Sequence, residues 1–255
     1  MADPIALSWL VGLALFPWPV AYIVQRYAGV GRHEAGLVAY NLAAITPNIA
    51  LTYIGVHLWF FDANLAAAYS AGHRERLYTP LSGSASMLSV CMGYEAWNTL
   101  AALVIPEYRT AAFVGHHATT LYLVLLARAP FVHVYVAFFI GVASASSVLL
   151  GFVDIFRHVG ALQRALPLTN TCLRVAFALT FLATRSALWL HISLRFWKDV
   201  YTVLAAGTAH SVWACGVYLA ANAFLTGLQL FWTWKIVQGL RKAAVGGGGE
   251  SARES

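Results

Sequence analysis

Residues 93–120 read GYEAWNTLAALVIPEYRTAAFVGHHATT, in which a short polar break separates two apolar segments. The segments extend over about residues 83–105 and 110–127, so each has roughly the length of a membrane-spanning helix. The break between them, PEYR at residues 106–109, is only about four residues long. A connection this short makes two consecutive helices neighbours and forces them to run antiparallel. The stretch therefore predicts a pair of packed transmembrane helices.

The composition of the whole chain indicates the same environment. Of its 255 residues, 60% are hydrophobic and 10% are charged, whereas soluble domains carry roughly 25% charged residues. Because backbone polar groups must be satisfied internally in a bilayer, repeated apolar stretches predict helices. The net charge of +6 does not indicate a nucleic-acid partner, because the basic residues stand singly at the ends of apolar stretches. The predicted class is an all-α polytopic membrane protein.

Apolar stretches predict about seven transmembrane helices, at residues 5–25, 36–59, 83–105, 110–127, 131–153, 169–193 and within 205–238. In the last of these, a short re-entrant or interfacial piece is expected before the span. We divide the chain into a first transmembrane helix at 1–30, a six-helix domain at 31–240 and a flexible polar tail at 241–255. Basic residues are more frequent in the loops on the carboxyl-terminal side, which predicts a cytosolic carboxyl terminus.

Polar side chains deep in a membrane are costly unless they are paired or functional, so they mark candidate sites. In the predicted spans these include Glu95, Asn98, His116, His117, Thr120, Arg185 and Gln229. Asn98 and His116 are equally distant from Glu107 in the sequence. A rise of about 1.5 Å per residue therefore places both roughly 13 Å deep, at the same level of the antiparallel pair.

Four sequence elements in the right order resemble the motifs of one membrane-protein family. The best match is the pair His116 and His117 with Thr120 three residues after the second histidine. The other elements are Gly93 with Tyr94, Phe181 with Arg185, and Gln229, Trp232 and Ile236 near the carboxyl end. Asn98 stands where an aspartate is usual, and the closing element has glutamine for asparagine. Together these elements resemble the TLC-domain family, which includes ceramide synthases, translocon-associated membrane proteins and a neuronal-lipofuscinosis protein.

This resemblance covers about residues 36–240 and implies six helices in a barrel around a lipid cavity, with one helix outside. It also suggests a location in the endoplasmic reticulum. In ceramide synthases the paired histidines belong to the acyl-transfer centre, and a His-Asp pair and a further aspartate follow. Here residues 138–147 contain no such acids, and the nearest one is Asp154. The expected function is lipid binding or sensing in membrane lipid homeostasis, and the alternative is a lipid acyltransferase.

The sequence allows two interpretations of the candidate residues, a catalytic and a non-catalytic one. His116 and His117 are expected to point into the cavity and form its functional centre, and they are the catalytic residues if the protein is an enzyme, with acyl-CoA as the acyl donor. The alternative is that they only form hydrogen bonds between helices. The expected lipid-binding residues are Glu95, Asn98, Thr120, Arg185, Gln229 and Trp232. No metal and no other cofactor is implied, and the sequence leaves protein partners open. Membrane lipids are the expected partners.

Local geometry suggests roles for individual side chains. Thr120 lies one turn from His116 on the same helix face, so its hydroxyl is expected to orient the histidine ring. Glu95 is either a paired structural acid or a replacement for the missing aspartate. Arg185 is expected to bridge to a carboxylate or to carbonyl oxygens, because a lipid-facing guanidinium is costly. The small residues at 143–147 are expected to form a close-packing surface.

Overall fold

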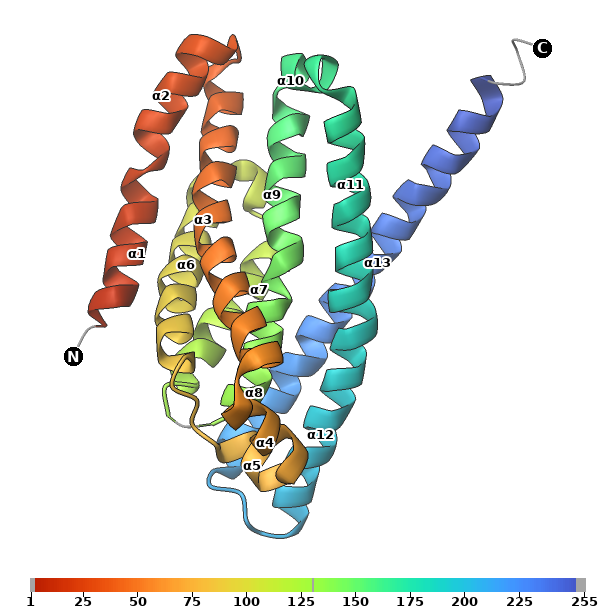
Figure 1. Ribbon diagram of the computed structural model, residues 1–255. Coiled ribbons are helices and arrows are strands. Elements are labelled where there is room, and N and C mark those ends of the chain that lie inside the picture. Colours follow the sequence, from red (N-terminus) through yellow and green to blue (C-terminus); the bar gives the residue numbers. More distant parts are fainter. Residues whose placement is uncertain (1–2, 130, 251–255) are drawn as a thin grey trace.

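The computed structural model describes residues 3–129 and 131–250, with side chains as far as Lys242, and most of these residues are helical (Figure 1). Five helical segments are long and apolar enough to cross a membrane: Pro4–Ala28, Arg32–Phe61, His133–His158, Pro167–Ala205 and Val212–Lys242. Two further helices, α6 (Ser84–Val104) and the shorter apolar α7 (Ala111–Leu126), lie between them in the sequence. The protein is therefore an integral multi-pass membrane protein.

The first apolar segment consists of two helices, α1 (Pro4–Leu15) and α2 (Pro17–Ala28). Proline has no backbone N–H and its ring clashes with the preceding turn, so Pro17 interrupts the helix. The Asp3 carboxylate caps α1 by accepting hydrogen bonds from the backbone of Ile5 and Ala6, both at 3.0 Å. α1 packs on α6 and α2 packs on α3, at one side of the molecule (Figure 1).

Helix α3 (Arg32–Phe61) contacts more of the molecule than its neighbours do, and Pro47 lies inside it. It packs against α9 (Ser144–His158), α6 and η2, a π-helical segment at Ala137–Val142. Gly55 and Gly141 meet where α3 crosses η2, so closely that a Cβ on either glycine would overlap the backbone of the other. The crossing therefore requires glycine on both helices, because only their missing side chains allow this approach.

The lower end of the molecule is covered by two short helices, α4 (Ala63–Ala71) and α5 (His73–Tyr78), and by α8 (His133–Val136) (Figure 1). At the upper end, α10 (Gly160–Ala165) connects α9 to α11 (Pro167–Phe181). A second π-helical segment, η3 (Leu182–Leu188), joins α11 to α12 (Trp189–Ala205). Short π-helical segments occur frequently at functional sites, and both of these lie in the middle of long apolar helices.

The last helix, α13 (Val212–Glu250), crosses the molecule diagonally and contacts α7, η3 and α12 (Figure 1). The re-entrant piece expected before it is absent from the described chain, because α12 continues to Ala205 and a short loop leads directly to Val212. The backbone is helical to Glu250, inside the range predicted as a flexible tail. Side chains of 243–250 and all of 251–255 lie outside the described residues, so the flexibility of that tail stays a prediction.

Candidate functional site

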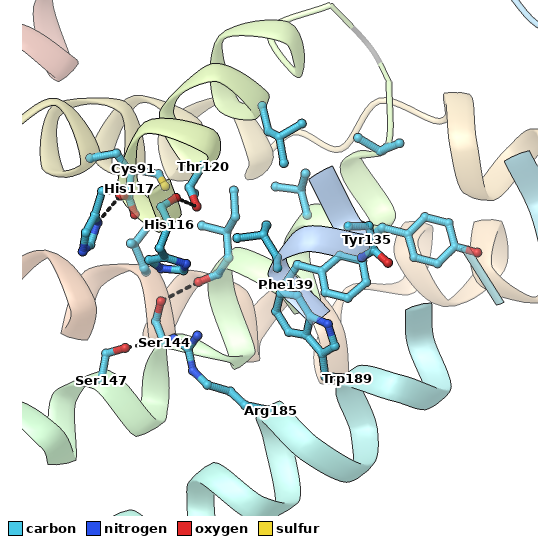
Figure 2. A pocket seen from close by; sticks show the side chains of 18 of the residues that line it. Cys91, His116, His117, Thr120, Tyr135, Phe139, Ser144, Ser147, Arg185 and Trp189 are labelled. Carbon is cyan, nitrogen blue, oxygen red and sulfur yellow. Dashed lines mark hydrogen bonds and ion pairs between the residues drawn. The ribbon is translucent and has the colours of Figure 1, made fainter. Parts of the chain in front are cut away.

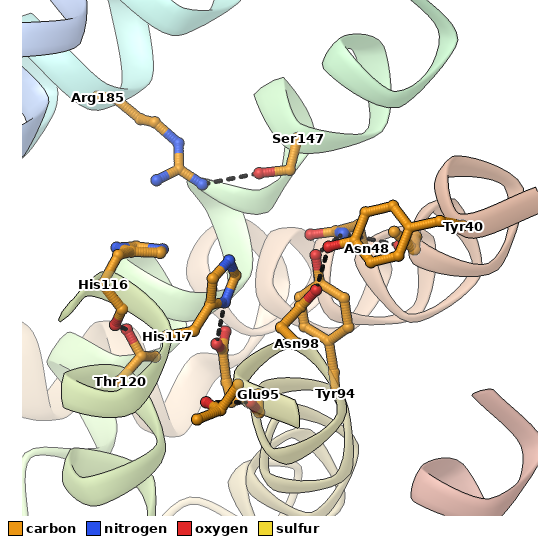
Figure 3. A network of polar contacts seen from close by, with 12 residues as sticks. Tyr40, Asn48, Tyr94, Glu95, Asn98, His116, His117, Thr120, Ser147 and Arg185 are labelled. Carbon is orange, nitrogen blue, oxygen red and sulfur yellow. Dashed lines mark hydrogen bonds and ion pairs between the residues drawn. The ribbon is translucent and has the colours of Figure 1, made fainter. Parts of the chain in front are cut away.

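The antiparallel pair α6 and α7 positions the first part of the site, as the short break between them predicts. The helices are joined by the 3-10 turn η1 (Pro106–Tyr108), and the Thr110 hydroxyl caps α7 by accepting from the backbone of Phe113 at 3.2 Å. Glu95 of α6 then faces His117 of α7, with Glu95 Oε2 2.5 Å from His117 Nδ1 (Figure 3). Their side chains are only 6% and 9% exposed.

This contact limits the hydrogen-bonding roles of the His117 ring. When Glu95 is ionised, its carboxylate can only accept hydrogen bonds, and His117 then donates from Nδ1 and keeps its lone pair on Nε2. A carboxylate that orients an imidazole in this way is the arrangement found in hydrolytic triads. Glu95 can be a structural partner or a replacement for the missing aspartate, and the geometry is compatible with both roles.

His116 points in a different direction from its neighbour, because adjacent helical residues differ by about 100°. Its ring centroid lies 4.9 Å from that of His117 and 5.5 Å from that of Trp232, in both cases edge-on. Its Nδ1 atom is buried and has no hydrogen-bond partner among the described residues. The Thr120 hydroxyl donates to the backbone oxygen of His116 at 2.9 Å (Figure 3). The prediction that this hydroxyl orients the ring is therefore wrong, because the hydroxyl bonds to the backbone carbonyl one turn back in its own helix.

Arg185 of η3 bridges to the segment that follows η2. Its Nε donates to Ala143 O at 3.1 Å and to Ser146 Oγ at 2.8 Å, and its Nη2 donates to Ser147 Oγ at 2.9 Å (Figures 2 and 3). The expected bridge to carbonyl oxygens is therefore present. The serines, however, do more than pack closely, because their hydroxyls help to satisfy a guanidinium inside the bundle. Sequence reasoning missed this role, since a Ser-Ala run has the same composition in either case.

Two cavities meet at these residues. The lower chamber has a cavity volume of about 110 Å³ and extends from the histidines towards α8, with Leu51, Phe139 and Trp189 among its apolar lining residues (Figure 2). The upper chamber has a cavity volume of about 310 Å³ and extends towards α10. Six residues line both chambers: Asn48, Tyr94, His116, His117, Ser147 and Arg185. The polar centre therefore lies between two chambers whose linings are both mainly apolar.

The structure brings most of the predicted site residues to these chambers. Glu95 and Thr120 line the lower chamber, and Trp232 lines the upper one. Asn98 and Gln229 line neither. Asn98 Oδ1 instead accepts a hydrogen bond from the Tyr40 hydroxyl, and its Nδ2 has no partner in the described part of the chain. The Gln229 amide is buried with neither polar atom bonded there, and we have no physical account of it.

Several site residues were not singled out from the sequence. Asn48 Nδ2 donates to the Tyr94 hydroxyl at 2.9 Å, and both side chains line the two chambers. Asn48 was detectable as a polar residue deep in an apolar helix, directly after Pro47. Asp154 and Lys235 line the upper chamber. Both lie near helix ends in the sequence, which is why they resemble ordinary interfacial residues.

A second buried ion pair lies at the lower end, away from the histidines. Arg76 of α5 donates from Nε to Asp199 Oδ2 at 2.5 Å and from Nη2 to Asp199 Oδ1 at 2.7 Å. Its Nη1 donates to Tyr69 O at 2.9 Å, and the Tyr135 hydroxyl donates to Asp199 Oδ2. The bond to Asp199 raises the pKa of Arg76 above its ordinary value. This cluster joins α5 and α8 to α12, across sequence separations of 123 residues for Arg76 and 64 residues for Tyr135.

No group of three or more His, Cys, Asp and Glu side chains within the described ranges is arranged to hold a metal ion. Apolar spanning helices around a buried histidine centre and two cavities define a polytopic membrane protein with an internal site. The model of the TLC domain matches residues 40–238, which is most of the chain. The protein therefore belongs to the TLC-domain family, as its sequence motifs predict. A search of curated proteins found no match to the chain.

Proposed function

We propose that this protein binds or senses membrane lipids in its two chambers and takes part in membrane lipid homeostasis. In this proposal the chain crosses the membrane seven times, and six of the spans form a barrel around the chambers. The helix neighbours favour such a ring, since α3 contacts α6 and α9, α6 contacts α7, and α7 contacts α13. The contacts of α13 with η3 and α12, and of α11 with α9, extend it. We place the protein in the endoplasmic reticulum with a cytosolic carboxyl terminus.

The observation that carries this proposal is the apolar lower chamber ending at a polar centre inside the bundle. An acyl chain gains about 0.8 kcal/mol for each methylene group removed from water, although a chain leaving the bilayer gains less. The specific interactions must therefore come from the polar end of the lipid. His116 Nδ1 supplies an unpaired hydrogen-bonding atom at that level, where a lipid ester or hydroxyl group can bond to it.

Filling the lower chamber tests this proposal. Ile140 lines that chamber, so Ile140→Trp should reduce its volume and displace bound lipid. Leu179→Trp is the matched control, because Leu179 is 64% exposed on α11 and lines neither chamber. Mass spectrometry of lipids retained by the purified proteins should show loss in Ile140→Trp and retention in Leu179→Trp. Equal lipid content in the two variants and the wild type would contradict the proposal.

A second candidate function, acyl transfer, is favoured by the contact between Glu95 and His117. In this reaction His117 Nε2 takes the proton of a lipid hydroxyl or amine while that group attacks the carbonyl carbon of an acyl thioester. The carbon–sulfur bond breaks, and the departing thiolate takes the proton back from the imidazolium. Acyl-CoA is the thioester that the family resemblance implies. The Glu95 carboxylate holds the ring and stabilises its charged form during the transfer.

Release of free thiol from an acyl thioester distinguishes the two functions. An enzyme should release thiol and form acylated lipid in equal amounts, and Glu95→Gln and His117→Ala should each reduce the rate at least about 100-fold. Retained lipid in the same preparations reports on binding alone. Lipid retention without thiol release in the wild type would leave lipid binding as the function.

A further inference from the structure

The upper chamber contains two opposite charges that do not neutralise each other. Asp154 comes from α9 and Lys235 from α13, and both side chains line this chamber. The two helices belong to different parts of the sequence, so the structure alone places these charges around one cavity. Asp154 is half-buried and Lys235 is exposed.

Within the described chain, neither charge belongs to one of the ion pairs, which involve other residues. The basic side chains that interact with Asp154 at longer range, Arg157 and His158, follow it within about one turn of α9. Lys235 Nζ lies 4.5 Å from the centroid of the Phe231 ring, a cation–π contact that leaves its three N–H donors free. A carboxylate in a spanning helix is costly when it has no direct ion pair, so one that lines a cavity without such a pair indicates a functional site. The contrast with Arg185, which has three hydrogen bonds, supports this interpretation.

The other polar groups of the upper chamber are mostly neutral. Asn41 Nδ2 lies 3.4 Å from the Tyr108 hydroxyl, and both residues line the chamber with Tyr40. Arg185 lies at the deep boundary, where its Nε and Nη2 are already bonded. Apart from Arg185, the chamber therefore offers one carboxylate and one ammonium group to a ligand, together with neutral polar groups.

We propose that Asp154 and Lys235 form a headgroup site for a zwitterionic phospholipid that carries a primary amine. The ammonium group of the lipid donates its N–H bonds to the Asp154 carboxylate, and the lipid phosphate accepts from Lys235 Nζ. The acyl region extends towards the membrane interior. This inference rests on lipid binding in the chambers, and it adds the class of headgroup. A quaternary ammonium headgroup lacks the N–H bonds and fits less well.

Competition between two phospholipids tests the site. The full-length protein in detergent is titrated with phosphatidylethanolamine and phosphatidylglycerol of identical acyl chains, and bound lipid is counted by native mass spectrometry. A charge-assisted hydrogen bond to Asp154 should favour phosphatidylethanolamine about tenfold. Asp154→Asn should remove this preference, whereas Asp154→Glu should keep most of it. This pair of results would show that the negative charge is responsible for the preference. If Asp154→Asn fails to fold, loss of preference at low pH in the wild type gives the same information.

The lysine is tested separately, because phosphate is common to both lipids. Lys235→Gln should weaken binding of both by a similar factor, again about tenfold. Lys242→Gln is the matched control on the same helix, since Lys242 lines neither chamber and should leave binding unchanged. Equal binding of the two lipids by the wild type, or an unchanged preference in Asp154→Asn, would overturn the headgroup site. If the wild type still retained lipid and Ile140→Trp reduced that lipid, lipid binding in the chambers would stand without the headgroup site. If the wild type retained no lipid at all, both proposals would be overturned.

Discussion

The protein contains two buried clusters of charged or titratable side chains, and they differ in how completely they are bonded. Arg76 and Asp199 at the lower end form two hydrogen bonds with each other and have further partners in the protein. In the central cluster, Glu95 and His117 are paired, but His116 Nδ1 has no partner within the described chain. A buried polar group is costly when unbonded. The fully hydrogen-bonded cluster at the lower end is therefore suited to hold helices together. The central cluster, which has an unbonded polar atom, is suited to bind a ligand.

The largest expected loss of stability comes from breaking the fully hydrogen-bonded cluster at the lower end. Asp199→Ala leaves the Arg76 guanidinium, 11% exposed, without its carboxylate, and should lower the free energy of unfolding by about 3–5 kcal/mol. Thermal unfolding in detergent measures this. The double variant Arg76→Met with Asp199→Leu should recover much of the loss, because it removes both charges. An Asp199→Ala protein as stable as the wild type would show that this cluster is not a structural clamp.

The paired half of the central cluster should come next in size. Glu95→Ala removes the hydrogen-bond partner of His117 Nδ1 in a buried place and should cost about 1–3 kcal/mol. Glu95→Gln keeps an acceptor oxygen and should cost less. The unfolding experiment used for Asp199 applies here, so the two clusters are compared directly. A larger loss for Glu95→Ala than for Asp199→Ala would reverse our assignment of the two clusters.

The unpaired histidine should matter least for stability and most for ligand binding. His116→Phe keeps the ring volume approximately and breaks no side-chain hydrogen bond of the protein, so the stability change should stay below about 1.5 kcal/mol. Lipid retained by the variant, measured by mass spectrometry, should nevertheless fall. A destabilised His116→Phe protein with normal lipid content would make this residue a packing residue like its neighbours.

The smallest effect is expected at an exposed pair, His33 and Glu107, where His33 Nε2 lies 2.6 Å from Glu107 Oε1. The pKa of Glu107 is lowered, chiefly by a hydrogen bond from its own backbone N–H and then by the bond from His33. The pKa of a glutamate in the unfolded chain is about 4.3, and the lowered pKa of Glu107 stabilises the fold at any pH above that. This stabilisation is lost as the pH falls through the pKa that Glu107 has in the folded protein. Melting curves of wild type and Glu107→Gln should therefore differ slightly at pH 6 and converge in acid. A difference that grows on acidification would contradict this sign.

The central pair shows how far sequence reasoning reaches in this molecule. Depth follows from the helical rise, so counting from the break at residues 106–109 predicted that Asn98 and His116 lie at the same level. The α6 side chain that bonds to a histidine is instead Glu95, about one turn from Asn98. The direction in which each side chain points was harder to predict from the sequence. Thr120 bonds to the backbone of its own helix, and Asn98 turns to Tyr40 of α3 instead of the chambers. These outcomes depend on which acceptor or donor a side chain meets, and the spacing of residues along one helix does not contain that information.

By itself, the sequence determined the membrane environment, the helical class, the TLC-domain family and the antiparallel pair that carries the histidines. The reason is that apolar length, short connections and motif spacing act locally along the chain. Tertiary structure alone decided the long-range pairs, such as Arg76 with Asp199, and the position of Asp154 opposite α13. It also decided that Arg185 bonds to Ser146 and Ser147. Such contacts depend on helix crossings such as the one at Gly55 and Gly141, where close backbone approach sets which faces meet.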